Sequence, residues 1–113
     1  MTHHDDRVSF RQMLAHSREI CDAVSGFQRD EFFSDRFREL ALFKLFEMVG
    51  ESASRVSDDT KRQYPAIPWR AVIGARNRLS HECDSVDYEV IWDAAQEHIP
   101  ELIAKLEEIL NQQ

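Results

Sequence analysis

The side chains best suited to catalysis gather in one short stretch of the sequence, between Arg76 and His81. A neutral histidine can take the proton from a ribose 2′-hydroxyl while another group protonates the leaving oxygen, and an arginine can stabilise the extra negative charge on phosphorus. No cluster of metal-ligating residues accompanies Arg76, Asn77 and His81, so this chemistry needs neither a metal ion nor another cofactor. These residue types therefore suit the cleavage of RNA.

The spacing of these residues limits how they can meet. Arg76 shares the apolar stripe of a predicted helix with Val72 and Ile73, where an unpaired guanidinium requires a carboxylate, a phosphate or a cleft. Arg76 and His81 are about 140° apart around an ideal helix, whereas Asn77 and His81, four positions apart, are neighbours. A shared site then requires the long reach of Arg76, a loosening of the helix near His81, or a second copy of the helix across a two-fold axis.

The same residues also allow a purely structural interpretation. Arg76 would then pair with a core carboxylate such as Glu51, and His81 would cap the end of a helix. In the catalytic interpretation, Glu51 and Ser80 are supporting residues. The residues alone leave both interpretations open.

The charge of the chain is unevenly distributed. A formal net charge of −7 argues at first against a nucleic-acid partner, since phosphates are bound by Lys and Arg. Residues 61–81, however, contain five basic residues and no acidic one, so this segment carries +5 and the remainder −12. The five are Lys61, Arg62, Arg70, Arg76 and Arg78. Such a run is either a solvated helix face or an RNA-binding surface, in which Arg70 and Arg78 would hold the RNA.

Apolar residues recur at steps of three and four along most of the chain, which is the period of an amphipathic helix. The pattern predicts one helix over residues 6–24, ended by Gly26, and a second over residues 30–56, about 40 Å long. The middle of the second helix is apolar almost all round, so it is central in the bundle or covered by a second subunit. We therefore expect a homodimer, because the chain cannot easily cover the apolar surface around Leu42, Phe43 and Phe46.

The second half of the chain contains clearer signals for where helices begin and end. Ser57 is a predicted cap for a short helical turn, and residues 64–68 form a connector in which Pro68 is the first residue of the next helix. A final helix is expected over residues 88–110, with a kink or split near Glu97 caused by Pro100.

These elements predict an all-α fold, an up-and-down bundle of four to five antiparallel helices in a single domain, residues 1–113. No apolar run is long enough to span a membrane and no signal peptide is recognisable, so we expect a cytoplasmic protein. Cys21 and Cys83 lack metal-ligand spacing and are expected to be reduced thiols.

Three segments of the sequence resemble the HepT-like family of the HEPN superfamily. They are residues 46–53, 67–81 and 84–92. The first resembles the Gly-Glu segment on the long second helix of that family. The second contains the family hallmark, an Arg and a polar residue followed by a His after a gap of four to six. Arg76, Asn77 and His81 meet this pattern, with four residues between the Arg and the His.

The resemblance implies a homodimeric helical bundle whose two hallmark motifs meet at the dimer interface and form a metal-independent ribonuclease cleft. It also implies a toxin encoded beside a minimal nucleotidyltransferase antitoxin. Such an antitoxin binds the toxin and in some pairs transfers AMP to a tyrosine two residues after the His. That position is Cys83 here, so AMP transfer to it is excluded and neutralisation by binding is favoured. Tyr88 is the nearest substitute, but a packing role is the simpler expectation for it.

Two functions from different classes follow. The first is an RNA-cleaving toxin in which Arg76, Asn77 and His81 are catalytic. The second is a non-catalytic helical partner of a nucleotidyltransferase, in which Arg76 and His81 bind a nucleotide phosphate or brace the interface. Loss of RNA cleavage on His81→Ala fits only the first.

Overall fold

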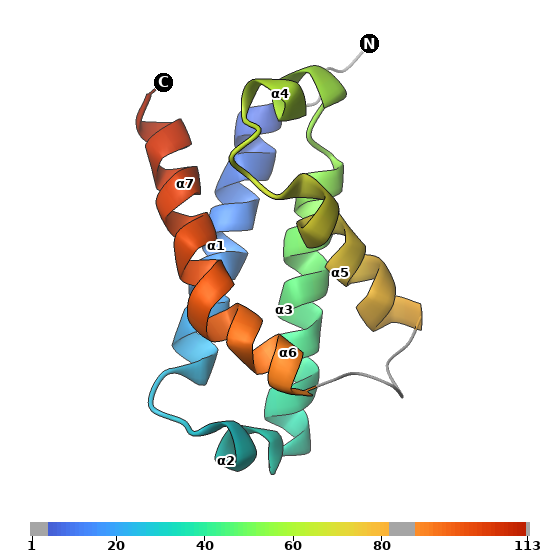
Figure 1. Ribbon diagram of the computed structural model, residues 1–113, viewed down its shortest axis with the longest axis vertical. Coiled ribbons are helices and arrows are strands. Elements are labelled where there is room, and N and C mark those ends of the chain that lie inside the picture. The colour runs from blue at the N-terminus through green and yellow to red at the C-terminus, as the bar shows by residue number, and fades with distance from the viewer. Residues whose placement is uncertain (1–4, 82–87, 113) are drawn as a thin grey trace.

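A computed structural model describes the backbone of residues 5–81 and 88–112, and the side chains of these residues apart from 76–81. Within these ranges the chain is all-helical and has no strand, as predicted (Figure 1). Two of the helices are short, α2 (Arg29–Phe33) and α4 (Asp58–Gln63). The longer segments are α1 (Asp6–Val24), α3 (Arg36–Ser54), α5 (Trp69–His81), and the consecutive α6 (Tyr88–Asp93), π-helical turn η2 (Ala94–His98) and α7 (Ile99–Asn111).

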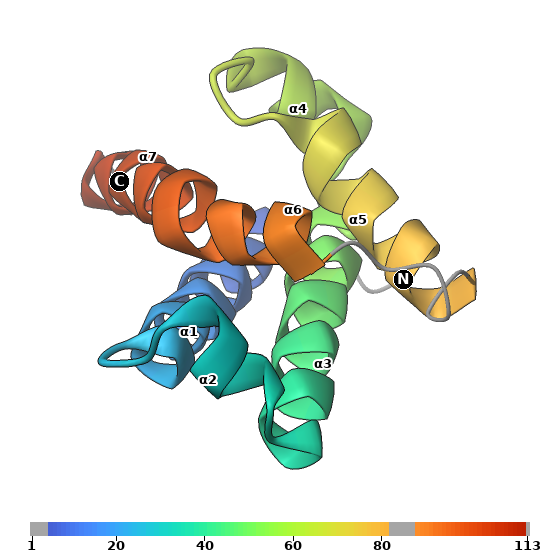
Figure 2. The same cartoon turned by 60° about the horizontal axis from the view of Figure 1, so that its bottom comes forward.

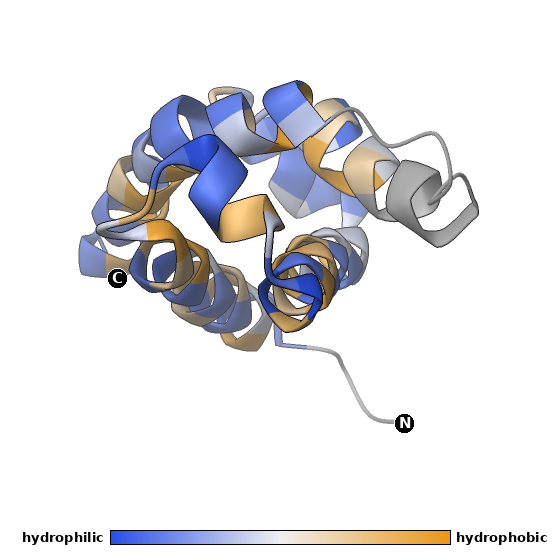
Figure 3. Cartoon of the chain, turned by 90° about the horizontal axis from the view of Figure 1, so that it is seen from below, coloured by the Kyte–Doolittle hydropathy of each residue, from blue (hydrophilic) through white to orange (hydrophobic). Residues whose placement is uncertain are grey.

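Successive long segments run in opposite directions, which gives the predicted up-and-down bundle. Helix α1 packs against α3 and α7, and α5 packs against α3. Figures 1 and 2 place α5 on the α3 side of the bundle, away from α7. Helix α2 lies across the lower end of the bundle, as the view from below shows (Figure 3). The helix that contains the candidate catalytic residues is therefore peripheral and is positioned mainly by α3.

The first helix agrees with its predicted bounds. Phe10, Met13 and Val24 are buried on one face of α1, as their three- and four-residue spacing requires. The stripe passes through Ile20, which is fully buried, while Cys21 beside it is only half-buried. Gly26 follows the helix with a φ of +83°, a conformation that glycine adopts without a steric penalty.

The prediction of one helix over residues 30–56 is wrong, because the chain breaks between α2 and α3. Asp35 caps α3 by accepting a hydrogen bond of 2.9 Å from the backbone N–H of Phe37. Ser34 donates from its hydroxyl to the carbonyl oxygen of Glu31 at 2.6 Å. These local side-chain hydrogen bonds compete with the backbone hydrogen bonds of a helix, so the helix is interrupted here. The three- and four-residue spacing of apolar residues continues across the break, which is why it predicted a single helix.

The irregularity predicted before Pro100 is confirmed. The backbone N–H of Ile99 donates to the carbonyl oxygen of Ala94, a bond that spans five residues, so the chain forms the π-helical turn η2 there. Pro100 has no N–H to donate, and its ring would clash with the carbonyl of Gln96 in a regular helix. The wider turn removes this conflict while the helix continues into α7.

The apolar residues in the middle of α3 are largely covered by the chain itself. Leu42 is fully buried, Phe46 is buried, and Phe43 is half-buried. Leu42 and Phe46 therefore offer no surface to a second subunit, and Phe43 offers only the part of its side chain that the chain leaves uncovered. The large apolar side chains that α3 does expose are Phe37, at 83% exposure, and Leu40.

Candidate functional site

The stretch from Arg76 to His81 lies at the C-terminal end of α5, which continues as a helix up to His81. The predicted roles of Arg76, Asn77, Arg78, Ser80 and His81 rest on side chains outside the described part of the structure, and Cys83 lies outside it altogether. Because the backbone stays helical up to His81, a loosening of the helix before this residue does not bring Arg76 and His81 together. The long reach of Arg76 and a second copy of the helix are the two routes that remain.

The first turn of α5 is fixed by its tryptophan. The indole Nε1 of Trp69 donates to the carbonyl oxygens of Lys61 and Tyr64, each at 3.1 Å. The Trp69 ring also lies 6.0 Å from the ring of Phe10, a core residue of α1. Helix α5 begins at Trp69, one residue after the predicted Pro68, whose carbonyl oxygen accepts from Val72 N–H at 3.0 Å.

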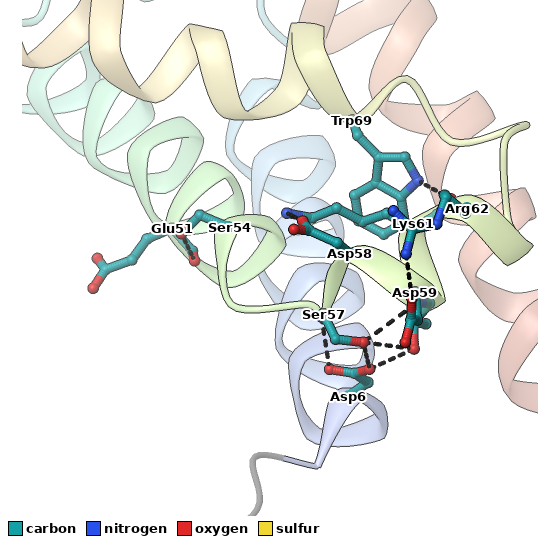
Figure 4. Close-up of polar contacts among 10 residues, drawn as sticks. Asp6, Glu51, Ser54, Ser57, Asp58, Asp59, Lys61, Arg62 and Trp69 are labelled. Carbon is teal, nitrogen blue, oxygen red and sulfur yellow. Dashed lines mark hydrogen bonds and ion pairs between the residues drawn. The ribbon is translucent and has the colours of Figure 1, made fainter.

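Helix α4 is held against the start of α1 by a small polar network (Figure 4). Ser57, the predicted cap, accepts from the backbone N–H of Thr60. The Asp6 carboxylate accepts from the Ser57 hydroxyl at 2.8 Å and from the Thr60 hydroxyl at 2.6 Å. Together with Trp69, this network makes α4 and the start of α5 one fixed corner of the bundle.

Glu51 forms its described ion pair with Arg55, the residue that directly follows α3. Its Oε1 lies 2.8 Å from Nη2 of Arg55, one turn further along the helix. Figure 4 shows the Glu51 side chain pointing away from Trp69. Arg55 therefore already occupies the Glu51 carboxylate, for which the predicted partner was Arg76.

A shallow, open groove of about 880 Å³ lies between α4 and α5. Three of its lining residues are basic, Lys61, Arg62 and Arg70, and none is acidic; the others are Pro65, Pro68, Trp69, Ala71 and Gly74. Sequence reasoning found the basic residues as a charge excess but missed the groove. The spacing places Arg70 and Gly74 one helical turn apart and therefore on one face of α5, but the groove itself depends on how α4 packs beside α5.

A buried carboxylate on α3 is a second feature that sequence reasoning missed. Glu39 is 5% exposed and accepts hydrogen bonds from the Tyr88 hydroxyl and from Nη1 of Arg36, the latter at 3.0 Å. The Tyr88 ring stacks on Phe33 and on Phe43, with ring centroids 4.7 and 6.2 Å apart. Because the bond to Glu39 favours the neutral phenol, it raises the pKa of Tyr88 above the ordinary value.

The described residues contain no group of three or more His, Cys, Asp or Glu placed to hold a metal ion. Cys21 is a free thiol. In the same part of the chain, no helix combines the length and apolar character needed to cross a membrane.

Comparison with known proteins gives a consistent result. The family model described as ribonuclease HepT-like matches residues 13–109. The chain is 30% identical over 105 residues to "Probable ribonuclease HepT" of Thermococcus cleftensis, covering 89% of this chain and 96% of that protein. It is 29% identical over 106 residues to "Putative RNase MJ0127" of Methanocaldococcus jannaschii, covering 94% and 88% respectively. No solved structure matches the chain.

Proposed function

The chain belongs to the ribonuclease HepT-like family, and we propose that it cleaves RNA through Arg76, Asn77 and His81 without a metal ion. The observation that carries this proposal is that the matched region contains α5, a helix that continues up to His81. Asn77 and His81 are four positions apart on this helix and therefore share one of its faces.

In the proposed reaction, His81 takes the proton from a ribose 2′-hydroxyl, whose oxygen then attacks the adjacent phosphorus. The bond from phosphorus to the 5′-oxygen breaks, and this oxygen receives a proton from a second acid, for which another copy of His81 across a two-fold axis is suitable. Arg76 stabilises the extra negative charge on phosphorus in the transition state. Asn77 orients His81 or the phosphate, while Arg70 and Arg78 hold the RNA.

The proposal is tested by cleavage of single-stranded RNA in the presence of EDTA. Losing one positioned transition-state donor costs on the order of a hundredfold in rate, so Arg76→Ala and His81→Ala should each lose that much activity. Arg18→Gln, which removes an arginine of α1 paired with Glu107 at 3.6 Å, is the matched control and should cleave like the parent. Cleavage abolished by EDTA would exclude the metal-independent mechanism. Folded Arg76→Ala and His81→Ala variants that cleave like the parent would exclude the assigned site.

We further propose that the protein is the toxin of a pair whose antitoxin is a minimal nucleotidyltransferase, and that it acts as a homodimer. The resemblance of residues 67–81 to the HepT-like hallmark supports this assignment. Because Cys83 occupies the position of the family tyrosine, the antitoxin would neutralise this chain by binding rather than by AMP transfer. A non-catalytic partner of the nucleotidyltransferase becomes the better description if the purified protein cleaves no RNA but still binds the antitoxin.

A further inference from the structure

We propose that the groove between α4 and α5 is a binding subsite for single-stranded RNA, one that holds the strand beside the cleavage site. This inference rests on the proposed ribonuclease function and adds to it Lys61, Arg62 and the apolar residues that line the groove with them. The groove is lined by Lys61, Arg62 and Arg70, and it has no acidic lining residue although the protein carries a net charge of −7. A cationic groove in an acidic protein is complementary to a phosphate backbone.

The three cations differ in whether a carboxylate already pairs with them and so competes with a phosphate. Arg70 is exposed and forms no ion pair with any other residue that the structure describes. Lys61 lies 3.9 Å from Asp58, and Arg62 pairs with Asp59, each three positions away on α4. Both carboxylates are more than 80% exposed, and such surface pairs contribute little energy in water. Arg70 is therefore the principal phosphate contact, and Lys61 and Arg62 can exchange their carboxylates for phosphates.

The apolar part of the groove lining favours a single strand over a duplex. Pro65, Pro68, Ala71 and the partly buried Trp69 line the same groove as the three cations. Unpaired bases can lie against apolar and aromatic side chains while their phosphates contact basic residues, whereas a duplex hides its bases. The Trp69 indole is bonded to α4, so this surface is fixed before RNA arrives.

The groove is aligned along α5 with positions 77 and 81 of the proposed cleavage site. Gly74 lines the groove, and positions 77, 78 and 81 follow it by three, four and seven residues, so they lie on the same face of the helix. At 1.5 Å per residue, the Cα atom of Gly74 is about 10 Å from that of His81 along the axis. A strand cleaved at His81 can thus continue into the groove.

Gly74 provides a matched pair of variants. A Cβ atom added there meets nothing within 4 Å, so a longer side chain enters open space in the groove. Gly74→Glu and Gly74→Gln are the same size, and both should improve the helix over glycine, so both are expected to fold. Their difference isolates the effect of a negative charge at the groove. Binding is measured by fluorescence anisotropy with a 2′-O-methyl single-stranded RNA, which cannot be cleaved through a 2′-hydroxyl.

We expect Gly74→Glu to bind this RNA at least roughly tenfold more weakly than Gly74→Gln, because like charges are placed together. The slope of log affinity against log salt should also fall by about 0.7 for each phosphate that the groove no longer binds. Arg70→Gln should lower the slope in the same way, whereas Arg18→Gln on α1 should not. Equal affinity and slope for the Glu and Gln variants would overturn the groove assignment.

A second measurement locates the RNA directly. The chain has two tryptophans, so Trp92→Phe leaves Trp69 as the reporter, and RNA bound in the groove should change its fluorescence. An unchanged Trp69 signal under conditions of saturating RNA would also overturn the assignment, as would tighter binding of a polyglutamate peptide than of RNA.

If the parent binds this RNA through the groove but cleaves no natural RNA, the proposed function fails and the groove stands. If the Gly74→Glu and Gly74→Gln variants cleave RNA equally well, the proposed function stands and the groove assignment fails.

Discussion

The hydroxyl of Tyr88, the first residue of α6, donates a hydrogen bond to the buried carboxylate of Glu39 on α3. This bond joins residues 49 positions apart, and it anchors the chain just after the segment that follows His81. The Tyr88 ring at the same time stacks on Phe33 of α2, so three helices meet at one side chain.

We predict that Tyr88→Phe lowers the stability of the protein in a pH-dependent way. The variant keeps the ring but leaves Glu39 without its phenol donor. Because the pKa of Tyr88 is raised in the folded state, the bond stabilises the parent below the ordinary phenol pKa of about 10 and is lost as the pH rises through the folded value. Thermal unfolding should show a lower midpoint for the variant at pH 7 and a smaller difference at higher pH. Equal midpoints at pH 7 would show that the bond contributes nothing.

Glycine-to-alanine changes at two positions should have opposite signs. Gly26 has a φ of +83°, so alanine there should cost about 1–2 kcal/mol. Gly74 is inside α5 with open space around its Cα, so alanine there should stabilise by up to about 1 kcal/mol. Urea unfolding of the two variants measures both values. Destabilisation by Gly74→Ala would mean that a neighbouring group crowds this face of α5.

The nucleotidyltransferase antitoxin that we propose should neutralise the protein without modifying it near His81. Cys83 has no phenolic oxygen, and the Tyr88 hydroxyl is already bonded to Glu39. Incubation with the cognate nucleotidyltransferase and ATP, followed by measurement of the intact mass, should therefore show an unmodified chain that still forms a complex. A gain of AMP units on the segment from Glu82 to Tyr88 would contradict this prediction.

We expect a homodimer at micromolar concentration, with a mass by light scattering of twice 13.3 kDa. The proposed chemistry needs a second acid, and a second copy of α5 near a two-fold axis would supply it. Phe37 is the most exposed large apolar side chain of α3. Phe37→Ser should therefore weaken the dimer if α3 contributes to the interface. A monomer would rule out the shared site and leave the reach of Arg76 as the remaining route.

Much of the architecture could be predicted because its causes act over a few neighbouring residues. The apolar period gave the bounds of α1, the Ser57 side chain marked the start of α4, and the missing N–H of Pro100 predicted the irregular turn before α7. The break between α2 and α3 is also local, but the continuing apolar period obscured the competing hydrogen bonds of Ser34 and Asp35.

The spacing of Arg76, Asn77 and His81, and the basic excess around them, are properties of the chain that hold in any tertiary arrangement. The burial of Glu39, the bond from Trp69 to the carbonyl oxygen of Lys61, and the groove depend instead on which helices become neighbours and at what angle. No local pattern encodes that choice, because the helices settle where the apolar faces of the whole bundle are buried together. The sequence could therefore name the groups that we propose react, while the packing of α4 and α5 created the surface that we propose holds the RNA.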